Sequence, residues 1–433
     1  MLYVLSLLTI LGVIFAVAAA DKAKRRTAPD NGANAVAAAA GSEQTEQPPW
    51  SSAPENESAS KQEDATGRPM ESQSQEDASG GAADSRGLYA SEAVGQSGDT
   101  QSVHEPGTAV NTERAIDAAA ENGAETTLIF VGDVLFDAAF RAGYDKAGID
   151  GVVTPALRQQ LQEADIFMMN HEFPFSDRGT PMEDKQFTFR CSPSYVSALG
   201  ELGVDIVTLA NNHTLDYGRE ALSDTMATLE QAGIPYVGAG ETKERAESLQ
   251  VIEKNGIRFG FLAATRVVPV VEWKVSVQTP GLFDCYDDRR LVELVREAKE
   301  QCDFLVVYPH WGIERSQIPE EYQTQTAARC VEAGADLIVG AHSHCLQSVE
   351  YIGDKPVFYS LGNFIFGYNI KSSAYLHVTV NDKKEAVCRL VPVSSSGGIT
   401  GLSEGSSGEQ ILSEVSGISS TAQILSSGVV TPK

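Results

Sequence analysis

The stretch Leu128–Asp133 reads LIFVGD, four consecutive apolar residues followed by a glycine and an acidic residue. A short apolar run that ends at a turn residue is typical of a strand buried on both faces, as in a parallel sheet. From Thr126 onward, short β-branched runs of this kind alternate with longer segments of helical periodicity. The alternation predicts an α/β fold.

The two kinds of segment can be placed along the chain by their periodicity and by turn residues. Strands are predicted at Thr127–Val131, Ile166–Met169, Ile206–Leu209, Phe259–Ala263, Phe304–Tyr308, Leu337–Val339 and Val357–Tyr359. Helices are predicted at Pro155–Ala164, Pro193–Leu202, Arg219–Ala232, Asp288–Gln301 and Glu320–Ala333. Thr154-Pro155 and Ser192-Pro193 are helix-start signals, and glycines follow the last turns of three helices.

Five predicted strands run directly into side chains that can bind a metal. The endings are LIFVGD with Asp133, IFMMNHE with Glu172, IVTLANNH with Asn212 and His213, FLVVYPH with His310, and LIVGAHSH with His342 and His344. Sites in open α/β sheets gather just beyond the carboxyl ends of strands. We therefore expect these side chains to meet at one site.

Each candidate also has a purely structural interpretation. An Asp such as Asp133 after a strand is more often a helix cap or turn residue. Glu172 is similar, and its neighbours Asn170 and His171 are alternative donors of the same ligand. His310 could instead be a histidine hydrogen-bonded under Trp311. The joint pattern favours a site, because most of the seven histidines fall at strand ends of one domain.

The histidines of the last strand end are the more specific signal. His342-Ser343-His344 can aim both imidazoles at one centre if the turn is extended. His104 lies in an acidic spacer and His377 in a late strand, so neither is assigned to the site. Imidazole, carboxylate and carboxamide ligands together suit Mn, Fe or Zn better than Ca or Mg. A pair of such ions favours hydrolysis or a related transfer.

Several motifs together resemble one protein family. They are Gly132-Asp133, Asn170-x-Glu172, ANNHTLDYG at 210–218, Pro309-His310-Trp311-Gly312-x-Glu314, Gly340-Ala341-His342-Ser343-His344 and YSLGNF at 359–364. The sequence resembles the bacterial capsule-synthesis CapA family, which is tied to poly-γ-glutamate production, from about Thr127 to Val391.

The resemblance implies a calcineurin-like metallophosphoesterase fold, with helix, sheet, sheet and helix layers and metal ligands at strand ends. It implies two divalent transition-metal ions, Mn, Fe or Zn. The residues that match ligand positions are Asp133, Glu172, Asn212, His310, His342 and His344, with Glu172 as the bridge. His213 matches the histidine that protonates the leaving group, so His213 and Asp133 are the expected catalytic residues.

Two features depart from the family pattern, and one further residue is a candidate substrate contact. Phosphoesterases of this fold usually begin with Asp-x-His, whereas Val134 and Leu135 follow Asp133 here, which predicts a weaker or vacant metal position. His171 and Ala341 also stand where family members often carry other residues. Arg190 is a candidate clamp for an anionic substrate, because a guanidinium pairs with carboxylate or phosphate in a forked geometry. A surface salt bridge is the alternative for Arg190.

The flanking segments have different compositions. Residues 1–20 include the apolar run Leu2–Ala20, which predicts a transmembrane anchor or a cleaved signal peptide. Residues 21–125 are predicted to be a disordered acidic linker: from Gly41 to Ala124 there are 16 acidic and 4 basic residues. The catalytic domain is predicted at 126–393. Residues 394–433, with twelve serines, are predicted to be a flexible tail with a strand or two around Gln410–Val415.

Charge limits the partners and the location. A net charge of −26 excludes a nucleic-acid partner, because phosphate binding needs clustered Lys and Arg. Basic residues after the apolar run favour a cytoplasmic domain by the positive-inside rule. The long acidic spacer favours a domain held outside the cell, or a secreted one after cleavage, and this is the placement we expect. The six cysteines form no CxxC pair and are expected to be buried thiols.

Three functions follow as hypotheses. The first is a membrane-tethered, metal-dependent enzyme that cleaves or transfers poly-γ-glutamate or a similar anionic polymer. The second keeps the site but acts on a phosphoester, by fold analogy alone. The third is a non-catalytic accessory subunit that organises a capsule synthase or exporter in the membrane.

Overall fold

The computed structural model describes residues 125–433. The predicted N-terminal membrane or signal segment and the acidic linker lie outside these residues. No helix within residues 125–433 is long and apolar enough to cross a membrane.

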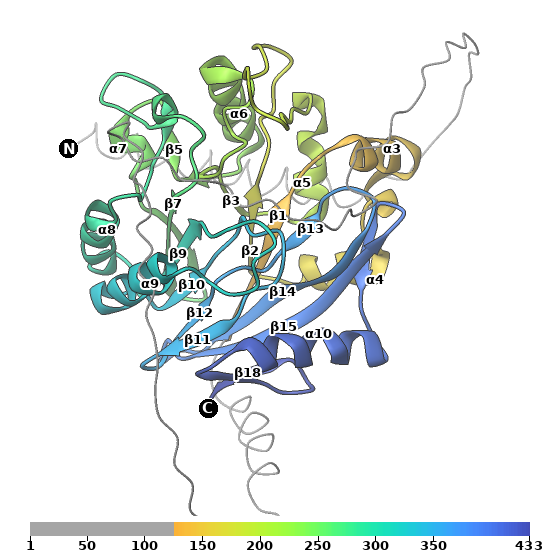
Figure 1. The fold of residues 1–433 in the computed structure, drawn as a ribbon, viewed down its shortest axis with the longest axis vertical. Coiled ribbons are helices and arrows are strands. Elements are labelled where there is room, and N and C mark those ends of the chain that lie inside the picture. Colours follow the sequence, from red (N-terminus) through yellow and green to blue (C-terminus); the bar gives the residue numbers. More distant parts are fainter. Residues whose placement is uncertain (1–124) are drawn as a thin grey trace, which may run out of the picture. The chain divides into compact units, whose positions relative to one another are not determined.

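Two β-sheets form the centre of the domain (Figure 1). The first sheet runs in the order β17-β18-β15-β14-β1-β2-β3-β4, and β13 and β16 pair with β1 and β15. Its parallel half comprises β1 (Thr126–Val134), β2 (Ile166–His171), β3 (Ile206–Thr208) and β4 (Tyr236–Val237). The other strands are β13 (Asn363–Ile365), β14 (Ile370–Val380), β15 (Ala386–Ser396), β16 (Ile399–Leu402), β17 (Ala422–Ile424) and β18 (Val429–Pro432).

The second sheet has six strands in the order β11-β12-β10-β9-β7-β6. They are β6 (Gln250–Lys254), β7 (Ile257–Thr265), β9 (Phe304–His310), β10 (Leu337–Val339), β11 (Val349–Ile352) and β12 (Lys355–Phe358). Strands β7, β9, β10 and β12 are parallel, so their carboxyl ends lie at one edge. A separate ribbon joins β5 (Ala239–Gly240) and β8 (Gly281–Leu282).

Strand alternation sorts the apolar side chains of β1 into two cores. Leu128 and Phe130 of β1 pack in the core that also holds Phe259 and Val306 of the second sheet, so this core lies between the sheets. Ile129 and Val131 point the other way, into the core under the helices of the first sheet. Each such buried aliphatic side chain contributes about 1.5–3 kcal/mol, so the alternation fixes the layering.

Helices cover the outer face of each sheet. The first sheet carries α3 (Ala138–Ala147), α4 (Pro155–Gln162), α5 (Ser197–Leu202) and α6 (Gly218–Ala232). The second sheet carries α8 (Arg289–Lys299) and α9 (Glu321–Ala333). Short elements are η2 (Gly148–Gly151), η3 (Pro193–Val196), α7 (Lys243–Ala246) and η4 (Val271–Trp273). These layers confirm the predicted helix, sheet, sheet and helix sandwich.

The helix boundaries follow the signals in the sequence. The Thr154 hydroxyl accepts a hydrogen bond from the Leu157 backbone N–H, and Pro155 occupies the first turn of α4. Gly203, Gly233 and Gly334 end α5, α6 and α9 in left-handed conformation, which glycine adopts without a steric penalty.

The C-terminal segment corrects the sequence prediction. Residues 394–433 are not a flexible tail: they complete β15, form β16, β17 and β18, and contain helix α10 (Gly405–Ile418). Gln410–Val415 is helical, not a strand. Ile411, Leu412 and Val415 share one helix face and enter the core between the sheets. Burial of this apolar face stabilises the helix despite the serine-rich composition. The predicted domain boundary at residue 393 falls inside β15.

Candidate metal centre

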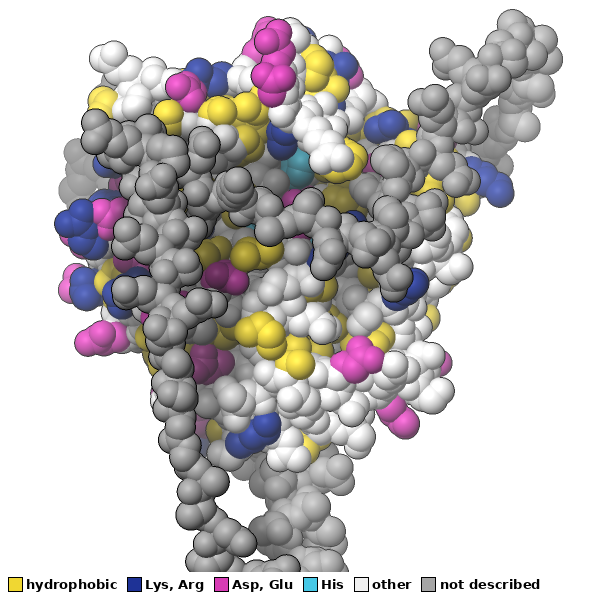
Figure 2. Space-filling model, viewed as in Figure 1, with side chains coloured by type: hydrophobic (Ala, Val, Ile, Leu, Met, Phe, Trp, Pro, Cys, Tyr) yellow, Lys and Arg dark blue, Asp and Glu magenta, His cyan; other side chains and the backbone are white. Residues whose placement is uncertain are grey.

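The carboxyl ends of strands from both sheets bring the predicted ligands together. Asp133 lies in β1, and Glu172 follows β2. Asn212 lies beyond β3, His310 ends β9, and the loop after β10 carries the last two histidines. Asp133, Glu172 and His310 are fully buried, and His344 keeps 16% of its side chain exposed. Figure 2 shows one histidine among the side chains visible on this face of the molecule.

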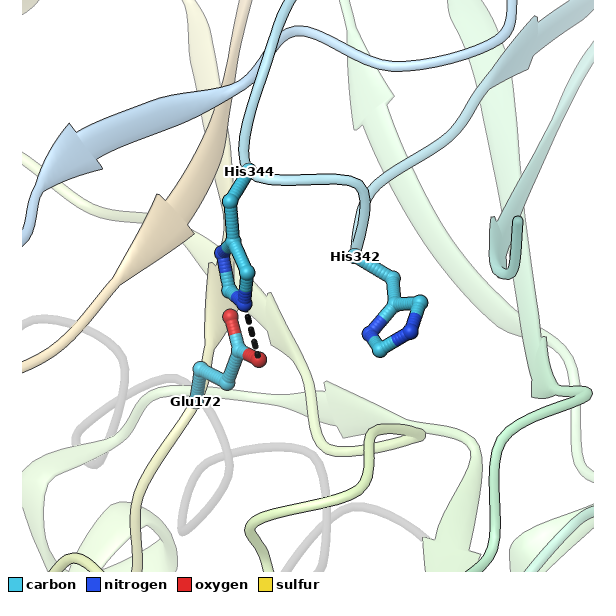
Figure 3. A group of neighbouring side chains, drawn as sticks. All are labelled: Glu172, His342 and His344. Atoms are coloured by element: carbon cyan, nitrogen blue, oxygen red, sulfur yellow. Dashed lines mark ion pairs between the residues drawn. The ribbon is translucent and has the colours of Figure 1, made fainter. Parts of the chain in front are cut away.

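The ligand atoms form two groups, each small enough to hold one ion. Glu172, His342 and His344 make one group, whose ligand atoms lie within 4.8 Å of one another (Figure 3). Asp133, Glu172 and His310 make the other. Glu172 belongs to both, which is the arrangement of a bridging carboxylate.

Unpartnered atoms test whether these residues fit a metal. Asp133 Oδ2, Glu172 Oε1 and His342 Nδ1 are buried and make no hydrogen bond, although Asp133 Oδ2 lies 3.0 Å from His344 Nδ1 in an ion-pair contact. An unsatisfied buried polar group costs roughly 1–3 kcal/mol, and a charged one more. Cations bound in the two ligand groups would give each of these atoms a partner, so the donor set fits divalent metal ions.

His344 is held in the tautomer that a metal ligand needs. Its Nδ1 lies 2.8 Å from Asn363 Oδ1, which can only accept a hydrogen bond. Nδ1 therefore carries the proton, and Nε2 keeps a lone pair 4.0 Å from Glu172 Oε1. Such an orienting partner is the usual second contact of a metal-binding histidine.

The two carboxyl groups have opposite pKa shifts. Burial acts to raise the pKa of Asp133, but the contact with His344 and its charge hold that pKa well below the usual value. Burial and the nearby charge of Asp133 raise the pKa of Glu172 well above its usual value. Burial also lowers the pKa of His344, yet its contacts with Asp133 outweigh this and raise the pKa overall. Two like charges cannot share this site without a cation.

The backbone of the last ligand loop is strained. His342 and His344 have φ of +97° and +55°, in the left-handed region that non-glycine residues rarely adopt. An extended turn was the condition under which the sequence allowed both imidazoles to share a centre, whereas the structure has both histidines in left-handed conformations. Asp133 Oδ1 accepts a 3.3 Å hydrogen bond from the His342 N–H, and the Ser343 carbonyl accepts a 2.7 Å bond from the Arg315 N–H. Strain of this kind persists only where the surroundings fix it.

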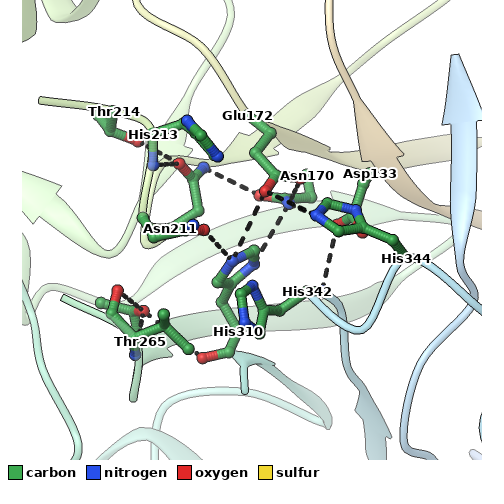
Figure 4. A network of polar contacts seen from close by, with 12 residues as sticks. Asp133, Asn170, Glu172, Asn211, His213, Thr214, Thr265, His310, His342 and His344 are labelled. Carbon is green, nitrogen blue, oxygen red and sulfur yellow. Dashed lines mark hydrogen bonds and ion pairs between the residues drawn. The ribbon is translucent and has the colours of Figure 1, made fainter. Parts of the chain in front are cut away.

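A chain of asparagines orients the carboxylates (Figure 4). Asn170 Nδ2 donates to Asp133 Oδ1 at 2.8 Å and to Glu172 Oε2 at 3.2 Å. Asn170 Oδ1 accepts from Asn211 Nδ2 at 3.0 Å. Asn170 therefore holds both carboxylates in place through its amide N–H groups, while its amide oxygen accepts a hydrogen bond. Asn212 Oδ1 lies 2.8 Å from His310 Nε2, inside the predicted ligand set.

The other alternative ligand, His171, points away from the centre. Its ring is fully buried and lies 4.0 Å from the ring of Phe173 and 4.7 Å from that of Phe175. Neither ring nitrogen has a hydrogen-bond partner. Alternation along β2 places Asn170 and Glu172 at the site and His171 in the outer core.

The predicted proton donor His213 has two neighbours that the sequence analysis did not assign. His213 Nδ1 lies 2.7 Å from Asp216 Oδ2, and Lys185 Nζ lies 3.1 Å from the same nitrogen while forming an ion pair with Asp216. Burial lowers the pKa of His213. The three-residue spacing in ANNHTLD could have identified Asp216, whereas no sequence pattern marks Lys185. Asn363 stands in the YSLGNF motif but was not assigned a role.

Arg190 is not brought to the ligand set. Its Nη1 donates to the Arg178 carbonyl at 3.0 Å, and its guanidinium lies 4.2 Å from the Tyr217 ring centre. The predicted substrate clamp therefore stays a prediction without a contact to the centre.

The fold is an α/β sandwich of two sheets, and the strand ends of both sheets form a candidate two-metal centre. Residues 127–368 match the model of the family described as bacterial capsule synthesis protein PGA_cap, and the chain belongs to this family. This confirms the resemblance to CapA proteins.

Named relatives agree with the family. The chain is 31% identical over 281 residues to capsule biosynthesis protein CapA of Bacillus anthracis, covering 62% of this chain and 67% of that protein. It is 31% identical to the PGA biosynthesis protein CapA of Bacillus subtilis, covering 55% and 62%. A probable polyglutamine synthesis accessory protein of Mycobacterium tuberculosis is 29% identical, covering 47% and 56%. The matched part thus spans between about half and two thirds of each relative.

Solved structures with a related arrangement are remote. A hypothetical protein from Thermus thermophilus has a TM-score of 0.40 at 15% identity, covering 62% of this chain and all of that one. The NAD nucleotidase of Haemophilus influenzae also scores 0.40, at 12% identity, covering 69% and 64%. Likeness at this level indicates no substrate.

Proposed function

We propose that the protein acts in the production of an anionic capsule polymer, poly-γ-glutamate or a similar chain, and cleaves or transfers it at a two-metal site. The observation that carries the proposal is the pair of ligand groups that share Glu172 and contain three buried atoms without a hydrogen bond. The family and the names of the relatives support the choice of polymer.

The residues divide the work as follows. Asp133, Glu172 and His310 would hold one ion, and Glu172, His342 and His344 the other, with Asn212 beside the first. Bound divalent ions would polarise a substrate oxygen and lower the pKa of water, which is the chemistry of hydrolysis. The hydrolytic step then needs a group that supplies a proton to the leaving atom.

His213 is suited to that proton transfer. In the tautomer whose Nδ1 donates to Asp216, Nε2 remains for exchange with a substrate. Burial lowers the pKa of His213, which makes its conjugate acid a stronger donor. Lys185 shares Asp216 with His213 and holds the loop after β2 at the site through the Asn212 carbonyl.

Location follows from the same proposal. A capsule polymer lies outside the cell, so we place this domain outside the membrane, tethered by the N-terminal apolar segment or released when that segment is cleaved. Capsule synthase subunits are the expected protein partners.

Turnover by the full chain tests the proposal. Purified protein with Mn²⁺ is incubated with γ-linked glutamate oligomers and, separately, with phosphodiesters, and products are measured by mass spectrometry. We expect new γ-glutamyl products, lost in His342→Asn and His213→Gln but kept in the matched histidine variant His171→Leu. Cleavage of phosphodiesters alone would replace the proposal with the phosphoesterase hypothesis.

An accessory role is the second candidate, and one relative carries that word in its name. The missing histidine after Asp133 also fits a site with reduced metal binding. Polymer production in cells lacking the protein would be restored by the double variant His213→Ala, His310→Ala if the role were only organising. We expect the double variant to fail.

A further inference from the structure

A cavity on the C-terminal part of the first sheet has no role in the proposed reaction. Its volume is about 460 Å³, and none of its lining residues belongs to the metal centre. Its walls come from β14, β15, α4, the start of α10 and the β17–β18 turn. Apart from its α4 wall, the cavity is built beyond residue 368, where the family match ends.

The cavity opens where the edge of β15 changes partner. Cys388 and Arg389 pair with β18, whereas Val393–Ser396 pair with β16. Leu390–Pro392 belong to neither ladder and line the cavity. Gly408 of α10 also lines the cavity and packs closely against the chain before the helix, because a Cβ atom at this position would lie 2.2 Å from the Ser403 carbonyl oxygen.

Hydrogen-bond donors converge on this gap. Arg389 lies directly opposite His377 across β14 and β15, and both line the cavity. Arg389 Nη1 donates to the Ser427 carbonyl at 2.9 Å, and within residues 125–433 the guanidinium makes no ion pair. Gln160 Oε1 accepts from the Tyr375 hydroxyl at 2.5 Å, which leaves the Gln160 amide N–H groups as donors.

The cavity is lined by one cationic side chain, Arg389, and one acidic side chain, Glu409. A cationic Arg389 facing His377 makes protonation of the histidine unfavourable. Burial and the charge of Arg389 lower the pKa of His377, so its ring is neutral and keeps one N–H to donate. Glu409 on α10 also lines the cavity and can accept a hydrogen bond from an amide N–H. A ligand that carries both carboxylates and amides matches this set.

We propose that the cavity binds a carboxylate-bearing amide chain, of which γ-linked glutamate is the example, and holds the polymer at a second point on the protein. The inference rests on the proposed function for the choice of polymer. Arg389 pairs with a carboxylate in its forked geometry, His377 and Gln160 donate to the same or the next carboxylate, and Glu409 accepts from a chain amide.

Binding without turnover tests the inference. The full chain carrying Asp133→Asn is titrated into a fluorescein-labelled γ-linked glutamate oligomer, and fluorescence anisotropy is recorded. Loss of a charge-assisted hydrogen-bond pair weakens binding by about tenfold or more. We expect that loss for Arg389→Gln and a smaller one for His377→Gln, and no change for Arg296→Gln, an exposed arginine on α8.

Several results would overturn the inference. One is that the oligomer binds Arg389→Gln and His377→Gln as tightly as it binds the parent protein. Another is that bound oligomer does not protect residues 403–428 from hydrogen exchange. Equal competition by polyphosphate would contradict recognition of an amide chain. A thermal melt identifies a variant that fails to fold, and then His377→Gln decides.

The two proposals can fail separately. If the protein turns over the polymer but Arg389→Gln binds the oligomer as tightly as the parent, the proposed function stands and the proposed binding site in the cavity is rejected. If binding depends on Arg389 but the protein with native Asp133 shows no turnover, the hydrolytic function is rejected and the binding site in the cavity stands.

Discussion

His344 Nδ1 and Asn363 Oδ1 lie 2.8 Å apart, and this contact joins two motifs from different strands into one ligand arrangement. Asn363 opens β13, which pairs with β1 at Asp133, so the same register places the asparagine, the carboxylate and the histidine together. The contact fixes the tautomer of His344, and Asn363 is not itself a candidate metal ligand.

Replacing Asn363 should weaken metal binding without removing a donor. We expect Asn363→Ala to lower Mn²⁺ affinity by about 10- to 100-fold, because the second contact of a metal-binding histidine has effects of this size. Isothermal titration calorimetry measures it. Asn363→Asp keeps an acceptor and should lose less, and Asn369→Ala serves as a control on an asparagine outside the centre. Equal affinities for Asn363→Ala and the parent would remove the role given to Asn363.

His171→Leu should stabilise the protein. The buried ring leaves both nitrogens unpartnered, and an apolar side chain of similar size removes that penalty of roughly 1–3 kcal/mol. Burial lowers the pKa of His171 to about 3, against about 6.5 in an unfolded chain. The unfolded state therefore gains a proton first, and stability falls as pH drops below 6.5.

Chemical denaturation at two pH values measures both effects of this substitution. The proton uptake by unfolded His171 costs the parent about 2 kcal/mol between pH 7 and pH 5, and His171→Leu should be spared this loss. A variant less stable than the parent at pH 7, or with the same pH dependence, would contradict the burial of a neutral, unpartnered ring.

Gly340→Ala should disrupt the loop that carries His342. A Cβ atom at Gly340 would lie 2.1 Å from the Tyr359 carbonyl oxygen, so the backbone must move. We expect a loss of about 3 kcal/mol or more in unfolding free energy, as for severe overpacking. Gly417→Ala in α10 is the matched control, since its Cβ meets nothing within 4 Å and alanine favours helix by up to about 1 kcal/mol. Similar thermal melts for the two variants would refute the close approach.

A chain ending at residue 393 should fail to fold. The cut removes the end of β15 and the α10 residues Ile411, Leu412 and Val415 from the core between the sheets. We expect aggregation or loss of the cooperative thermal transition, whereas a chain cut before residue 125 should keep it. A cooperative melt after the C-terminal cut would show that the segment is a tail after all.

Much of the fold was predictable because apolar runs and helix caps are local signals. The run before Asp133 and the cap at Thr154 are read from neighbouring residues alone. The α10 segment was not predicted, because its few apolar residues are buried only after the two sheets have formed the core in which they pack. Serine and glycine content hid a helical spacing that was present at 411, 412 and 415.

The candidate site was predicted in its ligands but not in its supporting contacts. Strand ends marked Asp133 and Glu172, and the family motifs ordered them. Lys185 could not be found, since its place beside His213 depends on the path of a loop. The left-handed loop of His342 and His344 contacts Asp133 and Arg315, which are distant in sequence, and no local pattern encodes such contacts.

Titration of the metal-free full chain with Mn²⁺, followed by calorimetry, tests the central claim most directly. We expect two binding events of unequal affinity. One ion should bind more weakly, because Leu135 stands where the Asp-x-His pattern has a histidine ligand. Glu172→Gln should weaken both events, since Glu172 belongs to both ligand groups. A single event, or two events that Glu172→Gln leaves unchanged, would contradict a two-metal centre bridged by this residue.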